Sequence, residues 1–250
     1  MGIKNTQIGA FRHGDCKYAQ GKTTLEEAYD LSPQGIATVE RRAESFAEHL
    51  SPTREVIMYS SPFGRALHTA KVAAKVFRNK KIPIRAMNIE PDLEELKNFS
   101  WEFFSPLING GELSYKGETM IIDRNLTNPQ GLSYQKYLIL DINHQVLELL
   151  KGKVSDSYLS YLSTIESLSS VDQRINNFLR RAVNSNRGRR DIIAITHEAA
   201  ISTIVDKFTR SESQALNRGN YVHLEARDNG IYVKSVGDFK EGNTSRNILE

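Results

Sequence analysis

Short apolar runs take turns with amphipathic segments at both ends of the chain, and few folds accommodate that order. Continuous apolar runs of a few residues predict buried strands, and apolar residues spaced by three and four predict helices. Strands that alternate with helices usually form a parallel sheet that is covered on both faces. The sequence therefore predicts an α/β fold, a three-layer α/β/α sandwich with a mostly parallel central sheet.

The expected elements can be placed from local signals. Ser32 and Pro33 have the residue types of a helix cap and a first helical position, and apolar residues follow on one face at 36, 39, 43, 46, 47 and 50. An Asn-Gly pair at Asn229 and Gly230, between two strand-like runs, predicts a hairpin. We expect strands over 7–11, 56–59, 82–86, 191–196, 221–226 and 231–236, and further helices over 65–77, 171–183 and 198–208.

The stretch from about 103 to 169 breaks the alternation. It contains paired glycines, an Asn-Pro step and several tyrosines, with a helical pattern only around 141–150. We interpret it as an insertion over one end of the sheet. The prediction is thus a single domain over 1–250, with the inserted segment forming a cap over the active site.

Composition narrows the class of protein. The single cysteine, Cys16, excludes an internal disulfide framework and fits a reducing compartment. No segment approaches the roughly 20 apolar residues that span a bilayer, and the first residues do not resemble a signal peptide. A net charge of +3 without a long basic run does not indicate nucleic acid. We expect a cytoplasmic protein with no membrane or nucleic-acid partner, and a homodimer stays open.

Reactive side chains follow three of the expected strands. Arg12, His13 and Gly14 follow the first strand, Arg65 opens the helix after the second, and His197 follows the strand over 191–196. Right-handed crossovers put the carboxyl ends of parallel strands at one edge of the sheet, where ligands bind. Two histidines and two arginines are therefore expected in one pocket.

That set of side chains suits a phosphoryl group. A neutral imidazole can attack phosphorus, and guanidinium groups bind phosphate oxygens and balance the charge that develops. A second imidazole can donate a hydrogen bond, and Gly14 lets the backbone approach closely. The leaving oxygen would still need a carboxylic acid to protonate it.

Three blocks carry a family resemblance: Phe11-Arg12-His13-Gly14, the run from Ser61 to Ala70, and Ala194-Ile195-Thr196-His197-Glu198. In this order and at these spacings, the sequence resembles the histidine phosphatase (phosphoglycerate mutase-like) superfamily over 6–100 and 170–236. The resemblance implies a phosphorylated His13, with Arg12, Arg65 and His197 as phosphate ligands and no cofactor or metal.

The resemblance also indicates a proton donor. The stretch from Leu93 to Glu102 is similar to the family segment in which a glutamate two residues after a leucine acts as the acid. This register favours Glu95 over Glu94, although the glycine usual between them is absent. The substrate is expected to be a small phosphate ester. Gly14 is expected to bind its phosphate, Cys16 and Glu198 are candidate substrate contacts beside His13 and His197, and topology makes Lys97, Tyr115, Tyr134 and Tyr137 available as further contacts.

Three other interpretations stay open. Residues 16–23 nearly match a phosphate-binding loop, but Cys16 stands where that loop needs its first glycine. A mutase would transfer the phosphate to a second acceptor, but the residues after Gly14 lack the serine, tryptophan and asparagine of glycolytic mutases. The third alternative is a non-catalytic phosphate-binding module on the same fold. We favour hydrolysis of a phosphomonoester, which release of free phosphate would distinguish from mutase activity.

Overall fold

The computed structural model divides the chain into two compact units, one of residues 1–94 and 173–250 and one of residues 95–172. It describes residues 5–17, 30–131, 147–148, 150–186, 188–208, 217–228, 230–236 and 239–240. The near match to a phosphate-binding loop falls mostly outside these ranges, as do Tyr134, Tyr137, Asn229 and most of the helix predicted over 141–150. We describe each unit by itself.

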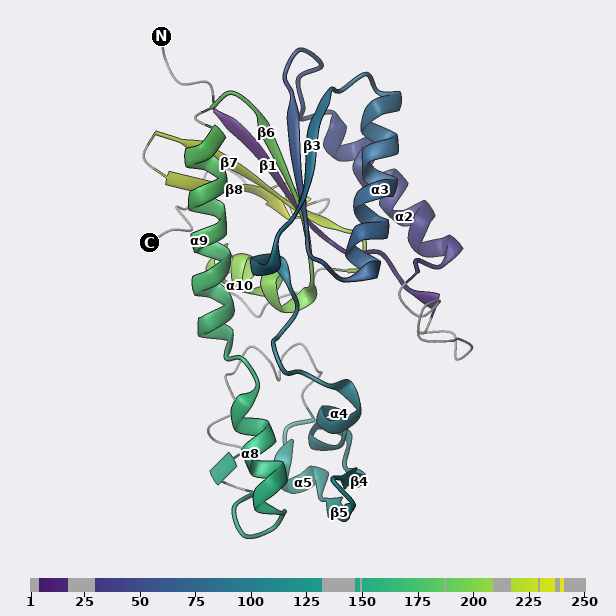
Figure 1. Cartoon of the computed structure of the whole chain (residues 1–250), viewed down its shortest axis with the longest axis vertical. Helices are drawn as coiled ribbons and strands as arrows, with labels where there is room; N and C mark the ends of the chain where they lie inside the picture. Colours follow the sequence, from purple (N-terminus) through teal and green to yellow (C-terminus); the bar gives the residue numbers. More distant parts are fainter. Residues whose placement is uncertain are drawn as a thin grey trace. The chain divides into compact units, whose positions relative to one another are not determined.

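The first unit is built on one twisted sheet (Figure 1). Seven strands can be followed in the described residues, in the order β3-β2-β6-β1-β7-β8-β9. Pairing is parallel from β3 through β2 and β6 to β1, and antiparallel from β1 through β9. Five of the seven strands run in one direction, as predicted. Their bounds are Thr6–Arg12 (β1), Val56–Ser60 (β2), Ile84–Ile89 (β3), Asp191–Thr196 (β6), Tyr221–Arg227 (β7), Gly230–Val236 (β8) and Phe239–Lys240 (β9).

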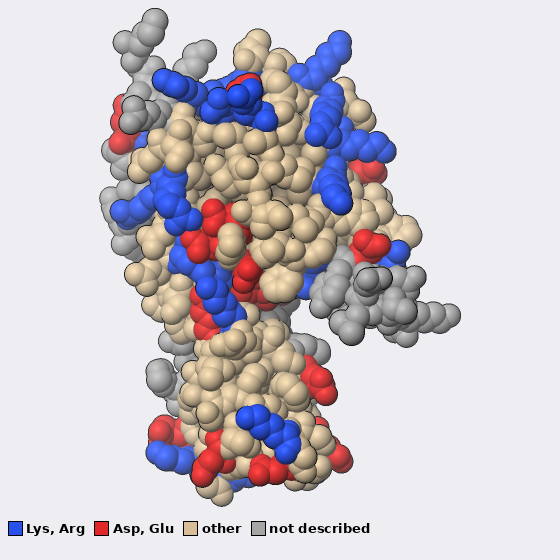
Figure 2. Space-filling model, viewed as in Figure 1, with Lys and Arg blue, Asp and Glu red and all other residues tan. Residues whose placement is uncertain are grey.

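Helices α2 (Pro33–Ala47) and α3 (Gly64–Asn79) cover one face of the sheet (Figure 1). The predicted cap of α2 is confirmed, since the Ser32 hydroxyl accepts a hydrogen bond from the backbone N–H of Gly35 at 3.0 Å. The buried side of α2 packs into a ring cluster, where Phe46 contacts Phe11 and Tyr221 with ring centroids 5.6 and 5.1 Å apart. The outer side of α3 presents lysines and arginines to solvent (Figure 2).

The opposite face is covered by α10 (Glu198–Phe208) and by the part of α9 (Leu168–Asn186) that belongs to this unit (Figure 1). The ring of Tyr59 on β2 meets that of Phe178 on α9, with centroids 5.2 Å apart. Because helices cover both faces, every residue of β6 is buried. This arrangement confirms the three-layer sandwich.

The predicted bounds hold best where the chain is most apolar. Strand β6 and helix α10 have the predicted bounds. Strand β3 begins two residues later than expected, because Ile82 is buried beside the end of α3, where its N–H bonds the carbonyl of Phe77. A short 3₁₀ turn, η2 (Pro91–Leu93), follows β3.

The second unit has more regular structure than the sequence indicated. It contains α4 (Trp101–Asn109), β4 (Gly111–Tyr115), β5 (Glu118–Ile122), α5 (Arg124–Thr127) and α8 (Asp156–Thr164). Strands β4 and β5 form a hairpin whose turn residues, Lys116 and Gly117, both have positive φ, as a type I′ turn requires. The predicted irregular segment is therefore corrected to a folded one.

Aromatic side chains form the centre of this second unit. Tyr115 packs against Phe103, Tyr158 and Tyr161, with ring centroids 5.1 to 5.7 Å apart. The Tyr158 hydroxyl donates a hydrogen bond to the Phe103 carbonyl at 2.7 Å. Tyr115 is thus occupied by packing, and the predicted role of this unit as a cap stays a prediction. Across the described residues of both units, no helix has the length and apolarity that a membrane crossing needs.

Candidate active site

Backbone hydrogen bonds hold together the strand ends that the sequence placed at one edge. The N–H of His13, just after β1, donates to the Thr196 carbonyl at the end of β6 at 3.0 Å. The N–H of Ser61, just after β2, donates to the Ile195 carbonyl at 2.9 Å. Because β6 lies between β1 and β2, these bonds fix the start of each connecting segment. His13, Arg65 and His197 are brought together at this edge.

His13 is buried and held in one orientation. Its Nδ1 lies 2.8 Å from the Gly14 carbonyl oxygen, which can only accept, so Nδ1 carries the proton. Its Nε2 therefore presents a lone pair, which accepts a hydrogen bond from Arg65 Nε at 3.1 Å. Burial, and next the positive charge of Arg65, hold the pKa of His13 well below 6.5. At neutral pH the ring is therefore uncharged, with a lone pair on Nε2.

Gly14 is required by packing. A Cβ on Gly14 would lie 2.9 Å from a methyl group of Val39 on α2. Its backbone N–H donates to the Thr69 hydroxyl of α3 at 3.0 Å. The close approach that the sequence predicted is thus an approach to α2, and a contact of Gly14 with phosphate stays a prediction.

His197 is fully buried opposite His13, with the two ring centroids 5.1 Å apart. Its Nδ1 lies 3.0 Å from Arg65 Nη2, and since a guanidinium only donates, Nδ1 accepts. The proton is then on Nε2, which donates to the Ser61 hydroxyl at 2.8 Å. Burial lowers the pKa of His197 well below 6.5, and the charge of Arg65 lowers it further.

Arg65 joins the two imidazoles. Arg65 lies in the first turn of α3 and its side chain is half-buried. Its guanidinium lies over the Phe63 ring, 5.1 Å from the ring centroid. Within the described part of the chain, Arg65 forms no ion pair with a carboxylate. A cation at the positive end of a helix dipole, facing two neutral rings, leaves the site with uncompensated positive charge. This is the electrostatic setting of an anion-binding site.

Arg12 has different surroundings. Its Nη2 donates to Glu198 Oε2 at 2.6 Å, and the side chains are only 8% and 9% exposed. Glu198 is the first residue of α10, directly after His197. The predicted site residues Arg12 and Glu198 are thus brought together as a buried ion pair.

Cys16 packs against the ring of His13. Its Sγ lies 3.9 Å from His13 Nδ1 and 3.5 Å from the Gly14 carbonyl, and the residue has no exposed surface. Burial raises the pKa of this thiol to about 11. Cys16 therefore packs against the His13 ring, and its predicted contact with a substrate stays a prediction.

One charged pair near the site was missed in the sequence. Arg218 forms an ion pair with Asp15, and the neighbouring Gly219 donates its N–H to the carbonyl of His13 at 3.0 Å. The positive charge of Arg218 also contributes to the lowered pKa of His13. Arg218 lies in a turn before β7 with no motif or periodicity around it, so nothing in the sequence pointed to it.

Two predicted site residues, Glu95 and Lys97, belong to the second unit. Glu95 Oε1 accepts a hydrogen bond from the N–H of Leu96, and the backbone of Lys97 pairs with Glu166. In the first unit, the Leu93 carbonyl accepts a hydrogen bond from the Thr196 hydroxyl at 2.7 Å, so the chain leaves that unit beside His197. The contribution of Glu95 and Lys97 to the site stays a prediction.

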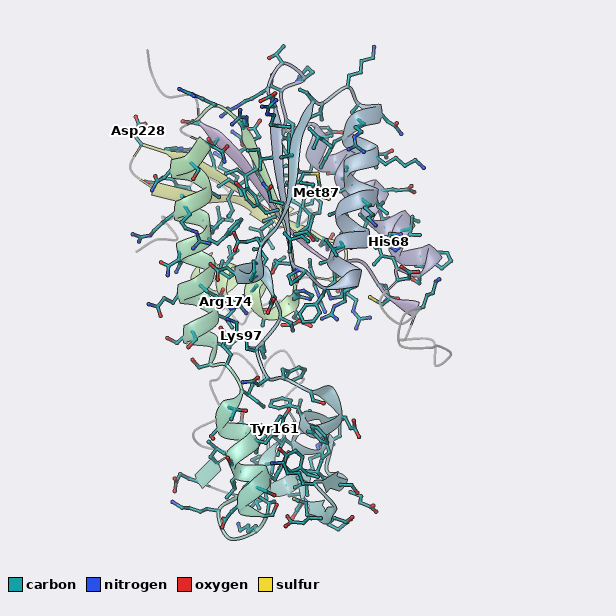
Figure 3. All side chains as sticks on the ribbon, viewed as in Figure 1. His68, Met87, Lys97, Tyr161, Arg174 and Asp228 are labelled. Carbon is teal, nitrogen blue, oxygen red and sulfur yellow. The ribbon has the colours of Figure 1, made fainter. Side chains whose placement is uncertain are left out.

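Two further features limit the chemistry. His68 on α3 (Figure 3) accepts a hydrogen bond from the Leu31 N–H at 3.2 Å, so this ring is occupied within the fold. Nowhere in the described ranges do three His, Cys, Asp or Glu side chains gather in a way that could hold a metal ion.

Comparison with known proteins identifies the family. The model of the histidine phosphatase superfamily, branch 1, matches residues 8–106 and 113–238. The chain belongs to this superfamily. A search of curated proteins gave no match.

Solved structures share the fold at low sequence identity. A phosphoglycerate mutase from Bacillus anthracis is 14% identical, with a TM-score of 0.61 over 94% of each chain. A phosphoserine phosphatase from Entamoeba histolytica, in complex with 3-phosphoglyceric acid, is 19% identical, with a TM-score of 0.54 over 94% of this chain and 98% of its own. A putative alpha-ribazole-5'-P phosphatase from Escherichia coli is 14% identical, with a TM-score of 0.53 over 96% and 99%.

Proposed function

We propose that this protein hydrolyses a small phosphomonoester through a phosphohistidine at His13. The observation that carries the proposal is the bridge from Arg65 to two neutral, buried imidazoles, at 3.1 Å to His13 Nε2 and 3.0 Å to His197 Nδ1. A phosphoryl group that enters between them meets a nucleophilic lone pair and a guanidinium at once. The superfamily includes phosphatases and mutases, which makes phosphoryl transfer the expected class of reaction.

The first chemical step forms the P–N bond. His13 Nε2 attacks phosphorus in line, the bond from phosphorus to the ester oxygen breaks, and the leaving oxygen takes a proton from a carboxylic acid. Arg65 and Arg12 hold the other phosphoryl oxygens. His197 joins them in its other neutral tautomer, in which Nδ1 donates to phosphate in place of accepting from Arg65 and Nε2 accepts from the Ser61 hydroxyl. Of these groups, Arg65 supplies charge that no carboxylate of the described residues compensates.

We assign the acid to Glu95. The assignment is supported by its position two residues after Leu93, whose carbonyl is held by Thr196 next to His197. In the second step the resulting carboxylate takes a proton from water, the water oxygen bonds to phosphorus, and the P–N bond breaks. The products are inorganic phosphate and free His13.

The nucleophile is tested by His13→Ala. We expect this variant to retain less than a few per cent of the phosphatase activity on p-nitrophenyl phosphate. The wild type, quenched during turnover, should carry an acid-labile phosphate that His13→Ala lacks. A variant with substantial activity, or with the label still attached, would show that His13 is not the nucleophile.

The acid is tested by comparing leaving groups. p-Nitrophenolate leaves without a proton, whereas an alkoxide needs one, so Glu95→Gln should lose at least about tenfold more activity on an alkyl phosphate than on p-nitrophenyl phosphate. Glu94→Gln is the matched control and should show no such difference. If the two variants exchange these results, Glu94 is the donor.

Free phosphate separates hydrolysis from the alternatives. A hydrolase releases one inorganic phosphate for each ester consumed. A mutase moves the phosphate to a second position without net release. A non-catalytic module would bind phosphate with no turnover of any ester in a screen of sugar phosphates, nucleotides and phosphopeptides.

A further inference from the structure

One of the groups assigned to phosphate binding is already paired inside the fold. Arg12 Nη2 donates to Glu198 Oε2 at 2.6 Å, and both side chains are more than nine-tenths buried. A bound phosphoryl group that contacts Arg12 must therefore share this guanidinium with a carboxylate.

The carboxylate of Glu198 is only half-satisfied. Its second oxygen, Oε1, is buried and has no hydrogen-bond partner in the part of the chain that the structure describes. A buried carboxylate normally accepts several hydrogen bonds, and leaving one oxygen without them costs stability. A buried ion pair is in any case a poor device for stability compared with apolar packing. Local arrangements that cost stability are most often found at functional sites.

The electrostatic effect of Glu198 on a bound anion has a definite sign. Two negative groups on one guanidinium repel each other, and the low exposure of the pair weakens screening by solvent. Arg65 has no such competitor among the described residues. The two arginines therefore contribute unequally to holding phosphate.

We propose that Glu198 sets the phosphate affinity of the site: it shares Arg12 with the bound phosphoryl group, weakens the binding of inorganic phosphate, and so favours release of this product. The proposal rests on the proposed function. In it, Glu198 acts on the phosphate through Arg12 and is a positioning residue.

The test is the inhibition constant of inorganic phosphate in Glu198→Gln, with p-nitrophenyl phosphate as substrate. Glutamine keeps the shape and an acceptor for Arg12 but removes the charge. We expect the inhibition constant to fall about tenfold, the effect of removing one repelling charge from a partly buried site. An unchanged or higher constant in a variant with the wild-type melting temperature would overturn the proposal, because a purely structural role predicts a loosened Arg12 and weaker binding.

Asp15→Asn is the matched control. Asp15 also pairs with an arginine near His13, but both side chains of that pair are 35% exposed. Solvent screening should limit its effect on the inhibition constant to less than about twofold. If Asp15→Asn tightened phosphate binding as much as Glu198→Gln, the effect would come from net charge and the assignment to the Arg12 pair would be wrong.

A second variant guards against misfolding. Glu198→Ala removes the unsatisfied oxygen together with the charge, and the same direction of change is expected. Failure of the inference can be told from failure of the proposed function. If the wild type neither hydrolyses p-nitrophenyl phosphate nor binds phosphate, both are overturned; if it does both and neither Glu198 variant binds phosphate more tightly, only the inference is.

Discussion

Two arginines stand at the same edge of the sheet in opposite electrostatic surroundings. Arg12, at the end of β1, is buried against the Glu198 carboxylate at 2.6 Å. Arg65, in the first turn of α3, is half-exposed and faces the neutral rings of His13 and His197. The charge of Arg12 is compensated by Glu198, whereas the charge of Arg65 has no carboxylate partner among the described residues.

The difference shows how one residue type can serve two purposes in one site. A buried arginine needs a partner for the fold to be stable, so its partner belongs to the structure. A half-exposed arginine is stabilised by water until an anion replaces that water. Substitutions of the two arginines should therefore have different main effects. Loss of Arg65 should mainly lower activity, and loss of Arg12 should mainly lower stability.

The largest effect is expected for Arg65→Ala. Removing a preorganised charge from the phosphoryl site should lower kcat/KM on p-nitrophenyl phosphate about a thousandfold. The melting temperature should not fall, because no ion pair within the described residues is lost. Arg65→Lys keeps the charge but lacks the planar guanidinium, so its kcat/KM should lie between the values of the wild type and of Arg65→Ala. A loss of less than tenfold for Arg65→Ala would remove the contrast with Arg12.

Arg12→Ala should lower the free energy of unfolding by about 3 kcal/mol, because it leaves the Glu198 carboxylate buried without its cation. Urea denaturation of the single variant and of Arg12→Ala with Glu198→Gln measures this effect. The double variant should recover most of the loss. Equal stability of the two would mean that the pair is not coupled.

His223 is a buried histidine that pairs with neither Arg12 nor Arg65, so it shows what burial does to a histidine pKa away from these arginines. His223 on β7 stacks on His49 with ring centroids 4.3 Å apart, and burial, followed by the charge of His49, lowers the pKa of His223 to about 4. The unfolded chain then binds this proton near pH 6.5, whereas the folded chain does not. The contribution of His223 to the free energy of unfolding is therefore complete above pH 6.5. It decreases as the pH is lowered from 6.5 to about 4, by at most about 3 kcal/mol.

His223→Gln should remove this part of the pH dependence. Glutamine can still bond the Gln7 side chain, which His223 contacts at 2.7 Å. The denaturation midpoints measured at pH 7, 5.5 and 4.5 should therefore differ less from one another in the variant than in the wild type. Parallel pH profiles for the two proteins would contradict the assignment.

The smallest effect concerns the charge on the two site imidazoles. Burial is the main cause of their lowered pKa values and Arg65 is the next. Nitrogen chemical shifts of His13 and His197 should show neutral rings at pH 6. In Arg65→Ala both pKa values should rise but remain below 6.5. Protonated rings at pH 6 in the wild type would mean that the site is not held neutral.

Much of the site's framework could be predicted from the sequence, because strong local signals coincide with it. The continuous apolar run of β6 predicted a fully covered strand, and the rule that parallel strands end at one edge predicted that His13 would meet His197. The Ser32 cap was predicted from its residue type. These features depend on neighbours in the chain or on the direction of a strand.

The remaining features depend on contacts that leave no local pattern. Glu198 was expected near the substrate, but its pairing with Arg12 depends on a side-chain geometry that spacing cannot give. Arg218 reaches Asp15 from an irregular turn. The β4–β5 hairpin turns at Lys116 and Gly117, a weaker turn signal than the Asn-Gly pair.

The order of strands has a consequence for how the protein becomes active during synthesis. β6 lies between β1 and β2, so the two strands made first cannot pair with each other and must await a partner translated much later. Until residue 196 has left the ribosome, His13 has no Thr196 carbonyl to bond and no facing ring. If the proposed function holds, a nascent or truncated chain that ends before β6 should therefore not turn over phosphate esters, however complete its first strands and helices are.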